Sequence, residues 1–509
     1  MGAQAPNRSV GPYAVPIVVL CSRNKVDYIP TVYAIHRLSG IVTPANAVYS
    51  VAELEHQLKS SGSQILITCV PLLDTALQAA KKAGIANDKI FILPMAGAET
   101  SHQFPSIEDL IKEGKALPDL EALKWTKGQG ARQPAMLSYS SGTSGLPKAV
   151  MVSHRNVIAN VIQQTTFEEV ARSQKGIKTQ VLLGLLPLSH IYGLIVVAHS
   201  STWRGDEVII LPKFELETLL AAIQKHKIEQ LLVVPPIVIR ILRSQDICRK
   251  YDMSSVRFLY TGAAPMGKET IEALEKQYPK WVIGQAYGMT ETATVVVTTS
   301  EHDILHKSSG SLVPGTRAKL VDLDGSEITE YDKPGELLVQ SPSVTLGYHN
   351  NEKATAETFI YDDDGRWIRT GDEVLVTLAP SGNEHFVVVD RIKELIKVKG
   401  HQVAPAELEA HLLTHPAVSD CTVIQVPDDH AGEVPKAFVV KAAEFESKPE
   451  EEVAQAIIKH VADHKASYKH LKGGVEFIDV IPKSPSGKIL RRFLRDKERE
   501  KRRKEGGKL

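Results

Sequence analysis

The stretch Leu137-Ser-Tyr-Ser-Ser-Gly-Thr-Ser-Gly-Leu-Pro-Lys148 contains four serine or threonine residues and two glycines within positions 140–145, and it ends in a lysine. Glycines let the backbone turn so that amide groups converge on an anion, hydroxyl groups add donors, and Lys148 adds a positive charge. Hydrophobic residues flank the stretch, as expected where a loop joins two buried strands. We therefore predict a phosphate-binding loop with contacts from Ser140, Ser141, Gly142, Thr143, Ser144, Gly145 and Lys148.

Spacing excludes two other motifs that such a loop could represent. A Walker A loop needs lysine directly after glycine, whereas Lys148 follows Pro147. The nucleophile elbow of hydrolases has the form G-x-S-x-G. Here Gly145 follows Ser144 directly, and a leucine occupies the position of the second glycine.

With its continuation, the stretch reads SYSSGTSGLPKAVMVSHRNV over residues 138–157. This segment resembles the phosphate loop of the adenylate-forming superfamily, and the chain most resembles its 4-coumarate:CoA ligase-like acyl- and aryl-CoA synthetases. The resemblance covers roughly residues 16–495. It implies an acid–thiol ligase that uses ATP to convert a carboxylic acid to acyl-AMP plus pyrophosphate, and then forms acyl-CoA plus AMP. ATP, Mg²⁺ and coenzyme A are the implied cofactors and substrates.

The distribution of apolar residues along the chain predicts an α/β fold. Short apolar strands such as residues 17–22 alternate with helical stretches, one of which opens with a capping box formed by Ser50 and Glu53. From about Gly310 the strands become short and rich in turn residues, and a second β/α alternation follows near residue 392. We expect a large N-terminal domain of layered mixed α/β sheets plus a small β-barrel-like subdomain (1–391), a small mobile α+β C-terminal domain (392–495) and a charged tail (496–509).

Further segments match the nucleotide-binding segments of the family in the same order. Tyr287 offers an aromatic face for a purine, and small neighbours leave room for it. Glu291 is a hard oxygen ligand suited to Mg²⁺, and Asp372, in an Arg-Thr-Gly-Asp segment, is the expected acceptor for the ribose hydroxyls. The resemblance adds Gly262, Ala263, Ala264, Gln285, Ala286, Gly288, Thr290 and Arg391 to the nucleotide contacts.

The resemblance also assigns the catalytic and hinge residues. Lys488, in Pro-Lys-Ser-Pro-Ser-Gly-Lys, corresponds to the lysine of the adenylation step, and an ammonium on a long side chain suits that role. Lys393 corresponds to the pivot of the C-terminal domain. The implied catalytic set is Lys488, His190, Thr290 and Glu291, and Lys397, Lys399 and Gly400 are assigned to the thioester step and CoA.

The segment Leu186-Pro-Leu-Ser-His190-Ile-Tyr192 matches the family segment in which a ring gates the acyl tunnel. His190 is therefore the expected gate, and Tyr192 and Val196, one helical turn apart, should face the acyl pocket. Small residues at Ala264 and Gly284 suggest a roomy apolar pocket for an aryl, arylpropenoic or medium-chain acid.

Composition argues against several other classes of protein. Sixty basic residues balance sixty acidic ones, so no overall field attracts nucleic acid or acidic lipid. The four cysteines form no CxxC pair, which argues against a disulfide framework and fits a reducing compartment. No stretch has the uninterrupted apolar length of a membrane span. We expect a cytoplasmic enzyme, with a weak peroxisomal alternative in Gly507-Lys508-Leu509.

Three alternatives to a CoA ligase remain at this level. They are a stand-alone adenylation enzyme that loads a carrier protein, a luciferase-like oxygenase, and a catalytically impaired homologue. The resemblance begins partway into the family's N-terminal region, so we expect that region to be shortened. The sequence does not specify the oligomeric state.

Overall fold

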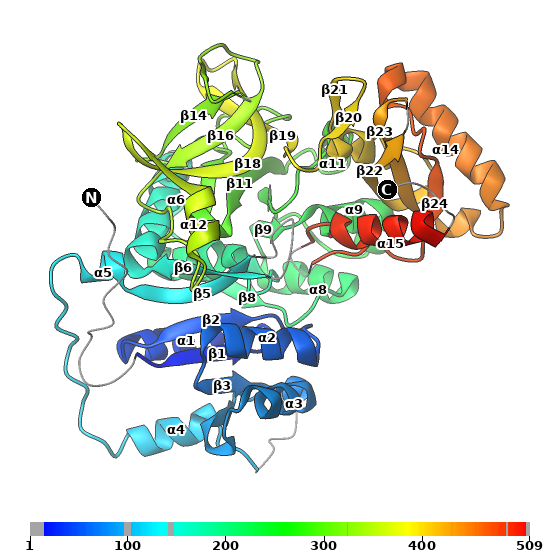
Figure 1. Ribbon diagram of the computed structural model, residues 1–509. Coiled ribbons are helices and arrows are strands. Elements are labelled where there is room, and N and C mark those ends of the chain that lie inside the picture. Colours follow the sequence, from blue (N-terminus) through cyan, green and yellow to red (C-terminus); the bar gives the residue numbers. More distant parts are fainter. Residues whose placement is uncertain are drawn as a thin grey trace.

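The computed structural model describes residues 15–95, 103–140, 147–322, 324–428, 430–484 and 487–504. Within them the chain forms three sheets with helices, followed by a fourth sheet near the C-terminus (Figure 1). The predicted α/β class, with a large N-terminal domain and a smaller C-terminal domain, is confirmed. No helix in these ranges combines the length and the apolar character that crossing a bilayer requires.

The first sheet has six strands in the order β4-β3-β1-β2-β5-β6. Its first strands are parallel, as helix crossovers require, and β5 and β6 form an antiparallel pair. The predicted capping box is present, because Glu53 N donates to Ser50 Oγ and Ser50 N donates to Glu53 Oε2. The elements are β1 Ile17–Cys21, α1 Tyr28–Arg37, β2 Ile41–Ala45, α2 Val51–Ser61, β3 Ile65–Thr68, η1 Val70–Leu72, α3 Leu73–Ala83, η2 Asn87–Lys89, β4 Ile90–Ile92, α4 Ile107–Gly114, α5 Gln129–Arg132, β5 Pro134–Ser140 and β6 Lys148–Ser153.

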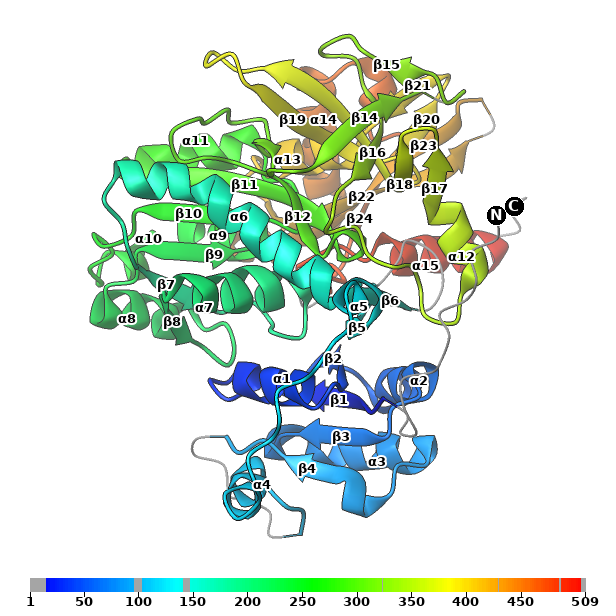
Figure 2. The ribbon, with the colours of Figure 1, turned by 90° about the vertical axis from the view of Figure 1, so that its left-hand side faces the viewer.

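The second sheet has seven strands in the order β13-β12-β11-β10-β9-β7-β8. Helix α6 crosses in front of this sheet in Figure 2 and contributes Val157 and Val161 to the same core as strand β12. The elements are α6 His154–Gln174, β7 Val181–Gly184, the π-helix η3 Tyr192–Ser200, α7 Ser201–Arg204, β8 Glu207–Ile210, α8 Leu216–His226, β9 Gln230–Val233, α9 Pro235–Arg243, α10 Gln245–Cys248, β10 Phe258–Thr261, α11 Lys268–Gln277, β11 Val282–Met289, η4 Thr290–Thr292, β12 Thr294–Thr298 and β13 Ser311–Leu312.

The third sheet is the predicted β-rich subdomain. Its long strand β18 pairs with β17 at its start, with β16 through its middle and with β19 along its second half. Backbone hydrogen bonds of Phe386 with Ser309 and Gly310 join it to the seven-stranded sheet. The elements are β14 Arg317–Val321, β15 Glu327–Ile328, β16 Gly335–Gln340, α12 Glu352–Thr358, β17 Phe359–Asp362, β18 Gly365–Leu378 and β19 Glu384–Arg391.

The C-terminal sheet has its own core, built around β22 and β23. Helix α15 runs past residue 495, where the sequence suggested a charged tail, because the carboxylate of Glu498 is buried against Lys436 (2.6 Å). The elements are β20 Ile396–Val398, β21 His401–Val403, α13 Pro405–Leu412, β22 Val418–Asp428, β23 Gly432–Lys441, η5 Ala443–Phe445, α14 Glu450–His464, η6 Ser467–Lys469, β24 Val475–Phe477 and α15 Arg491–Lys504.

Candidate active site

The predicted phosphate loop connects two antiparallel strands. Ser140, the last residue of β5, is the cross-strand partner of Lys148, the first residue of β6. The remaining predicted loop contacts lie outside the described residues; they are Ser141, Gly142, Thr143, Ser144 and Gly145. Ser140 and Lys148 therefore lie on the last two strands of the first sheet.

Lys148 and Glu291 are brought together by a residue that the sequence interpretation did not single out. The Lys148 ammonium lies 5.0 Å from the centre of the Tyr348 ring. The Tyr348 hydroxyl donates to Glu291 Oε1 (2.9 Å), and burial and the Glu291 charge raise the pKa of Tyr348. Glu291 is buried in η4, directly after Thr290. In the sequence, Tyr348 is marked only by its position after Gly347, at the end of a turn-rich stretch.

The two predicted adenine segments lie side by side, because β10 and β11 are parallel neighbours. After β10, Gly262 lies against the Tyr192 ring, since a Cβ added there would lie 3.2 Å from Tyr192 Cε1. Ala263 has a φ of 68°, which non-glycine residues rarely adopt. Ala264 follows and is half-buried. Strained backbone of this kind is common at binding sites.

On β11, two predicted contacts have structural roles. Gln285 Oε1 accepts a hydrogen bond from Met266 N (3.0 Å), which fixes the segment after Ala264. Gly284 is closely packed, because a Cβ there would lie 2.7 Å from Phe258 Cζ. The side of Gly284 that was expected to open the acyl pocket is therefore filled by an aromatic ring. Ala286, the next small residue, is half-buried.

Tyr287, Asp372 and Arg391 form the predicted ribose end of the site. The Tyr287 hydroxyl donates to Asp372 Oδ2 (2.7 Å), and Arg391 Nε lies 3.6 Å from Asp372 Oδ1. Asp372 on β18 and Arg391 on β19 are cross-strand partners. Burial, and next the Asp372 carboxylate, hold the pKa of Tyr287 well above its ordinary value. The arrangement thus presents a buried carboxylate beside an aromatic ring and a cation.

Lys488 extends from the C-terminal domain into this group of charges. Burial and the nearby charge of Arg391 lower the pKa of Lys488 to about 8. The carboxylates of Asp372, Glu291 and Glu394 act in the opposite direction. The structure therefore places the predicted catalytic lysine within electrostatic reach of the predicted nucleotide residues.

A tight turn seats the Lys488 loop on the large domain. Ser484 N donates to Lys488 O (2.7 Å), and Gly487 N donates to Ser484 O (2.8 Å). Gly487 has a φ of 82°, and a Cβ there would lie 3.1 Å from Val234 Cγ2. Two constraints therefore favour glycine at position 487: the left-handed backbone conformation and the close approach of the chain to Val234. Val234, between β9 and α9, was not anticipated from the sequence.

The predicted acyl residues follow His190. Its Nδ1 accepts a hydrogen bond from Tyr192 N (3.2 Å), and burial and the Lys488 charge lower the pKa of His190 to about 4. The ring is thus neutral at pH 7. Tyr192 and Val196 are buried on η3, which is a π-helix where an α-helix was expected. Such π segments often occur at functional sites.

The predicted hinge and thioester residues lie at the surface of the C-terminal domain. Lys393 is exposed in a turn after β19. Lys397, Lys399 and Gly400 are exposed on the β20–β21 hairpin, whose two-residue turn has φ values of 49° and 83° at Lys399 and Gly400. Positive φ at both positions is the signature of a type I′ hairpin turn.

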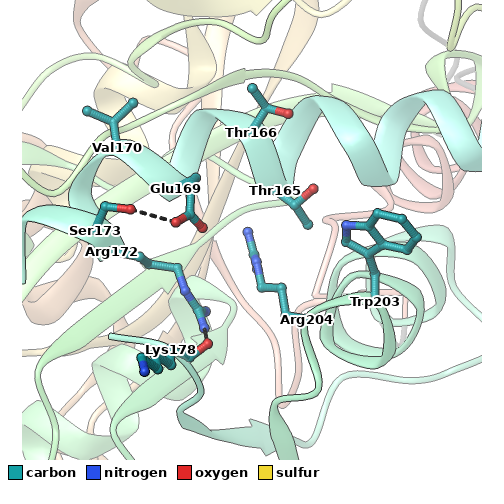
Figure 3. A pocket seen from close by; sticks show the side chains of 9 residues that line it. All are labelled: Thr165, Thr166, Glu169, Val170, Arg172, Ser173, Lys178, Trp203 and Arg204. Atoms are coloured by element: carbon teal, nitrogen blue, oxygen red, sulfur yellow. Dashed lines mark hydrogen bonds between the residues drawn. The ribbon is translucent and has the colours of Figure 1, made fainter. Parts of the chain in front are cut away.

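A pocket of about 490 Å³ opens beside α6 and α7 and contains none of the predicted site residues (Figure 3). Figure 3 shows Arg204 pointing between Thr165 and Arg172. Arg204 also pairs with Glu168 (2.5 Å), whose charge acts on Tyr192. Arg204, which lines the pocket, is therefore held by a carboxylate that does not line it.

Comparison with known proteins agrees with this geometry. A family model described as AMP-binding enzyme matches residues 8–349, and one described as AMP-binding enzyme C-terminal domain matches residues 407–488. Acyl-CoA ligase AFT1-1 of Alternaria alternata is 42% identical over 94% of this chain and 82% of its own length. The 4-coumarate–CoA ligase of Pinus taeda is 35% identical over 94% of this chain and 85% of its own. The solved ATP-bound RpMatB-BxBclM chimera B1 matches with a TM-score of 0.79 and 26% identity, over 96% and 89% of the two chains.

The chain therefore belongs to the AMP-binding enzyme family, the adenylate-forming superfamily that the phosphate loop indicated. Within that family it is an ATP-dependent, AMP-forming acyl-CoA ligase. Its substrates are a carboxylic acid, ATP and coenzyme A.

Proposed function

We propose that Lys488 stabilises the carboxylate of the acid and the α-phosphate of ATP while they react. Lys148 and the loop before it hold the β- and γ-phosphates. The observation that carries this proposal is the position of Lys488, whose pKa responds to Arg391, Asp372 and Glu291 although it belongs to another domain. Two anions must meet for the reaction to occur, so positioning and charge neutralisation supply most of the catalysis. A carboxylate oxygen then attacks the α-phosphorus, and pyrophosphate leaves.

In the second half-reaction, the thiolate of coenzyme A attacks the acyl carbon, and AMP leaves with the bonding electron pair. We assign Lys397, Lys399 and Gly400 to this step. Rotation of the C-terminal domain about Lys393 would withdraw Lys488 from the active site and bring their hairpin to it. Their exposure in an arrangement where Lys488 is inserted supports this assignment. His190, which is neutral and adjacent to Lys488, suits a gate between the acyl and nucleotide sites.

The residues present also fit Mg²⁺. Glu291 is a buried carboxylate, and only its Oε1 accepts a hydrogen bond from the described residues, so Oε2 remains available as a hard oxygen ligand. Such an ion would neutralise charge on the triphosphate. Thr290, the preceding residue, lies on the same turn.

For the acid we propose an aryl, arylpropenoic or medium-chain compound. The buried Tyr192 ring, which stacks edge-on to Tyr260 at 6.5 Å, and the apolar Val196 favour such groups. The similarity to a 4-coumarate–CoA ligase supports an arylpropenoic acid. Tyr192 Oη is buried without a hydrogen-bond partner among the described residues, so a hydroxyl or carbonyl on the acid would satisfy it. AMP release from a panel of these acids, with and without such a group, identifies the substrate.

The first prediction separates the two half-reactions. Lys488→Ala should lower acid-dependent ATP–pyrophosphate exchange by about 10²–10³-fold, the usual effect of removing a preorganised charge. It should leave thioester formation from a synthetic acyl-adenylate near the wild-type rate. Lys448→Ala, which removes an exposed lysine of the same domain, serves as the control. Normal pyrophosphate exchange by Lys488→Ala would refute the assignment.

A carrier-bound phosphopantetheine thiol is the alternative acceptor, and rates with free coenzyme A and with such a carrier distinguish the two. For the cellular location we propose the cytoplasm. The peroxisome is the alternative that Gly507-Lys508-Leu509 suggests, although these residues lie outside the described ranges. Imaging of a fusion tagged at the N-terminus tests this choice.

A further inference from the structure

Four histidines gather where α13 packs against α14 in the C-terminal domain, and none of them belongs to the active site. His411 lies in the last turn of α13, and His415 lies in the turn that follows. His460 and His464 lie one turn apart on α14. Residues four positions apart on a helix share one face, so both imidazoles of α14 point toward the end of α13.

The nitrogens of three of these rings lie close enough together to converge on one metal ion. One ligand nitrogen each from His411, His460 and His464 lies within 4.8 Å of the others. The His411 and His460 rings stack with their centres 4.3 Å apart, and the His460 and His464 centres are 5.2 Å apart. Nitrogen ligands about 2.0–2.1 Å from a tetrahedral ion are roughly 3.4 Å from one another. The stacked His411 and His460 rings are nearly parallel, at 4°, so side-chain rotations at this partly exposed edge must turn both rings toward the ion as well as close the gap.

Each of the three rings makes one hydrogen bond to a backbone or hydroxyl oxygen. His411 Nε2 and His464 Nδ1 both contact the backbone carbonyl of His460, at 3.3 and 2.9 Å. His460 Nε2 contacts Thr414 Oγ1 at 3.0 Å. Each ring therefore has one oriented nitrogen and a second one to offer. A histidine that binds a metal usually donates its other N–H to a backbone carbonyl or similar group.

We propose that His411, His460 and His464 form a binding site for a divalent transition-metal ion of the zinc class. Imidazole donors suit Zn²⁺, Ni²⁺ and Cu²⁺, whereas Mg²⁺ and Ca²⁺ prefer oxygen ligands. The site is therefore chemically distinct from the Mg²⁺ position at Glu291. Water or His415, whose ring centre is 5.2 Å from that of His460, supplies the fourth ligand.

The ion would join α13 to α14, and α13 also supports the catalytic loop. Glu409, two residues before His411, accepts from Arg491 Nη2 (2.7 Å), which lies three residues after Lys488. Glu409 also accepts from Val423 N (2.8 Å) on β22. A metal ion at the histidines would thus stiffen the support of the Lys488 loop.

Isothermal titration calorimetry with Zn²⁺ tests the site directly, using untagged, metal-free full-length protein without ATP or Mg²⁺. We expect one equivalent to bind and the melting temperature to rise. His464→Gln and His460→Gln should each weaken binding at least ~10-fold, because even second-shell partners of a metal are typically worth 10–100-fold in affinity. The His464 ring is exposed, so this variant should retain the fold.

His430→Gln provides the matched control, because it removes an exposed histidine of the same domain outside the cluster. Its zinc affinity and stoichiometry should equal those of the wild type. Equal affinity in the wild type and His464→Gln would overturn the proposal, and so would the absence of binding at millimolar Zn²⁺. Since the readout is binding without substrates, it is independent of the residue roles proposed for catalysis.

Discussion

At the scale of single residues, Lys488 shows how position changes chemistry. An exposed lysine has a pKa near 10.4, whereas burial and the charge of Arg391 lower that of Lys488 to about 8. The charged form is the one that can stabilise two anions. The same burial makes His190, its neighbour, a weaker base, with a pKa of about 4. The two groups therefore do not compete for a proton at neutral pH.

This environment predicts the pH dependence of adenylation. Lys488 is charged below its pKa and loses its proton above it, so kcat/KM for adenylation should fall about tenfold per pH unit above roughly pH 8. The fall in kcat should begin at higher pH, because bound phosphates favour the ammonium. Measurements of pyrophosphate exchange from pH 6 to 10 check the predicted falls in kcat/KM and in kcat.

Lys488→Arg provides the control for this assignment, since a guanidinium stays charged throughout that range. The alkaline fall in kcat/KM should disappear from whatever activity the variant retains. A limb that persists unchanged in Lys488→Arg would belong to another group.

At the scale of elements, the β11–β12 hairpin explains why glycine follows Tyr287. The register of the two strands shifts between Tyr287 and Gly288. A Cβ at Gly288 would lie 1.6 Å from the carbonyl oxygen of Thr294, which is far inside van der Waals contact. Gly288 was predicted as a nucleotide contact, and the hairpin requires glycine there in any case.

We predict that Gly288→Ala forces the two strands apart and costs about 1–3 kcal/mol of stability, as overpacking commonly does. Because Tyr287 and Glu291 lie on either side of the distortion, ATP should also bind more weakly. Thermal unfolding with and without ATP measures both effects. Gly114→Ala, on α4, is the control, because a Cβ there meets nothing within 4 Å. A melting temperature for Gly288→Ala equal to that of this control would contradict the argument.

At the scale of the whole molecule, contacts between the domains hold Lys488 in the site. Arg243, the last residue of α9, donates to the carbonyl of Val418 (2.7 Å) and to that of Ser419 at the start of β22. A Cβ at Gly267, which precedes α11, would lie 2.8 Å from Ala410 Cβ on α13, so the two domains pack closely there as well. If the C-terminal domain rotates for the second half-reaction, as we propose, both contacts must break.

Arg243→Ala should therefore destabilise the arrangement that supports adenylation. Hydrogen bonds from charged groups are typically worth about 1.5–3 kcal/mol, so we expect pyrophosphate exchange to fall by roughly tenfold or more. Thioester formation from a synthetic acyl-adenylate should be unchanged or faster. Arg240→Ala, exposed on the same helix, is the control. An equal loss in both half-reactions would show that Arg243 serves the fold rather than this arrangement.

The sequence by itself determined the family, the α/β class and most elements of both domains. These features depend on short-range patterns: the hydroxyl and glycine spacing of residues 140–145, the Ser50–Glu53 capping box, and the short apolar stretch at residues 17–22. Each can be recognised from neighbouring residues because the pattern lies within one segment.

Only the tertiary structure decided how distant groups meet. Tyr348 links Lys148 to Glu291, residues 143 positions apart in the chain, and no local pattern specifies that pairing. The π-helix at η3, the packing of Phe258 at Gly284 and the convergence of His411 with His460 have the same origin. Such contacts depend on which surfaces the sheets bring together. The electrostatic environment of a side chain and the room around it are set by residues that lie far away in the sequence.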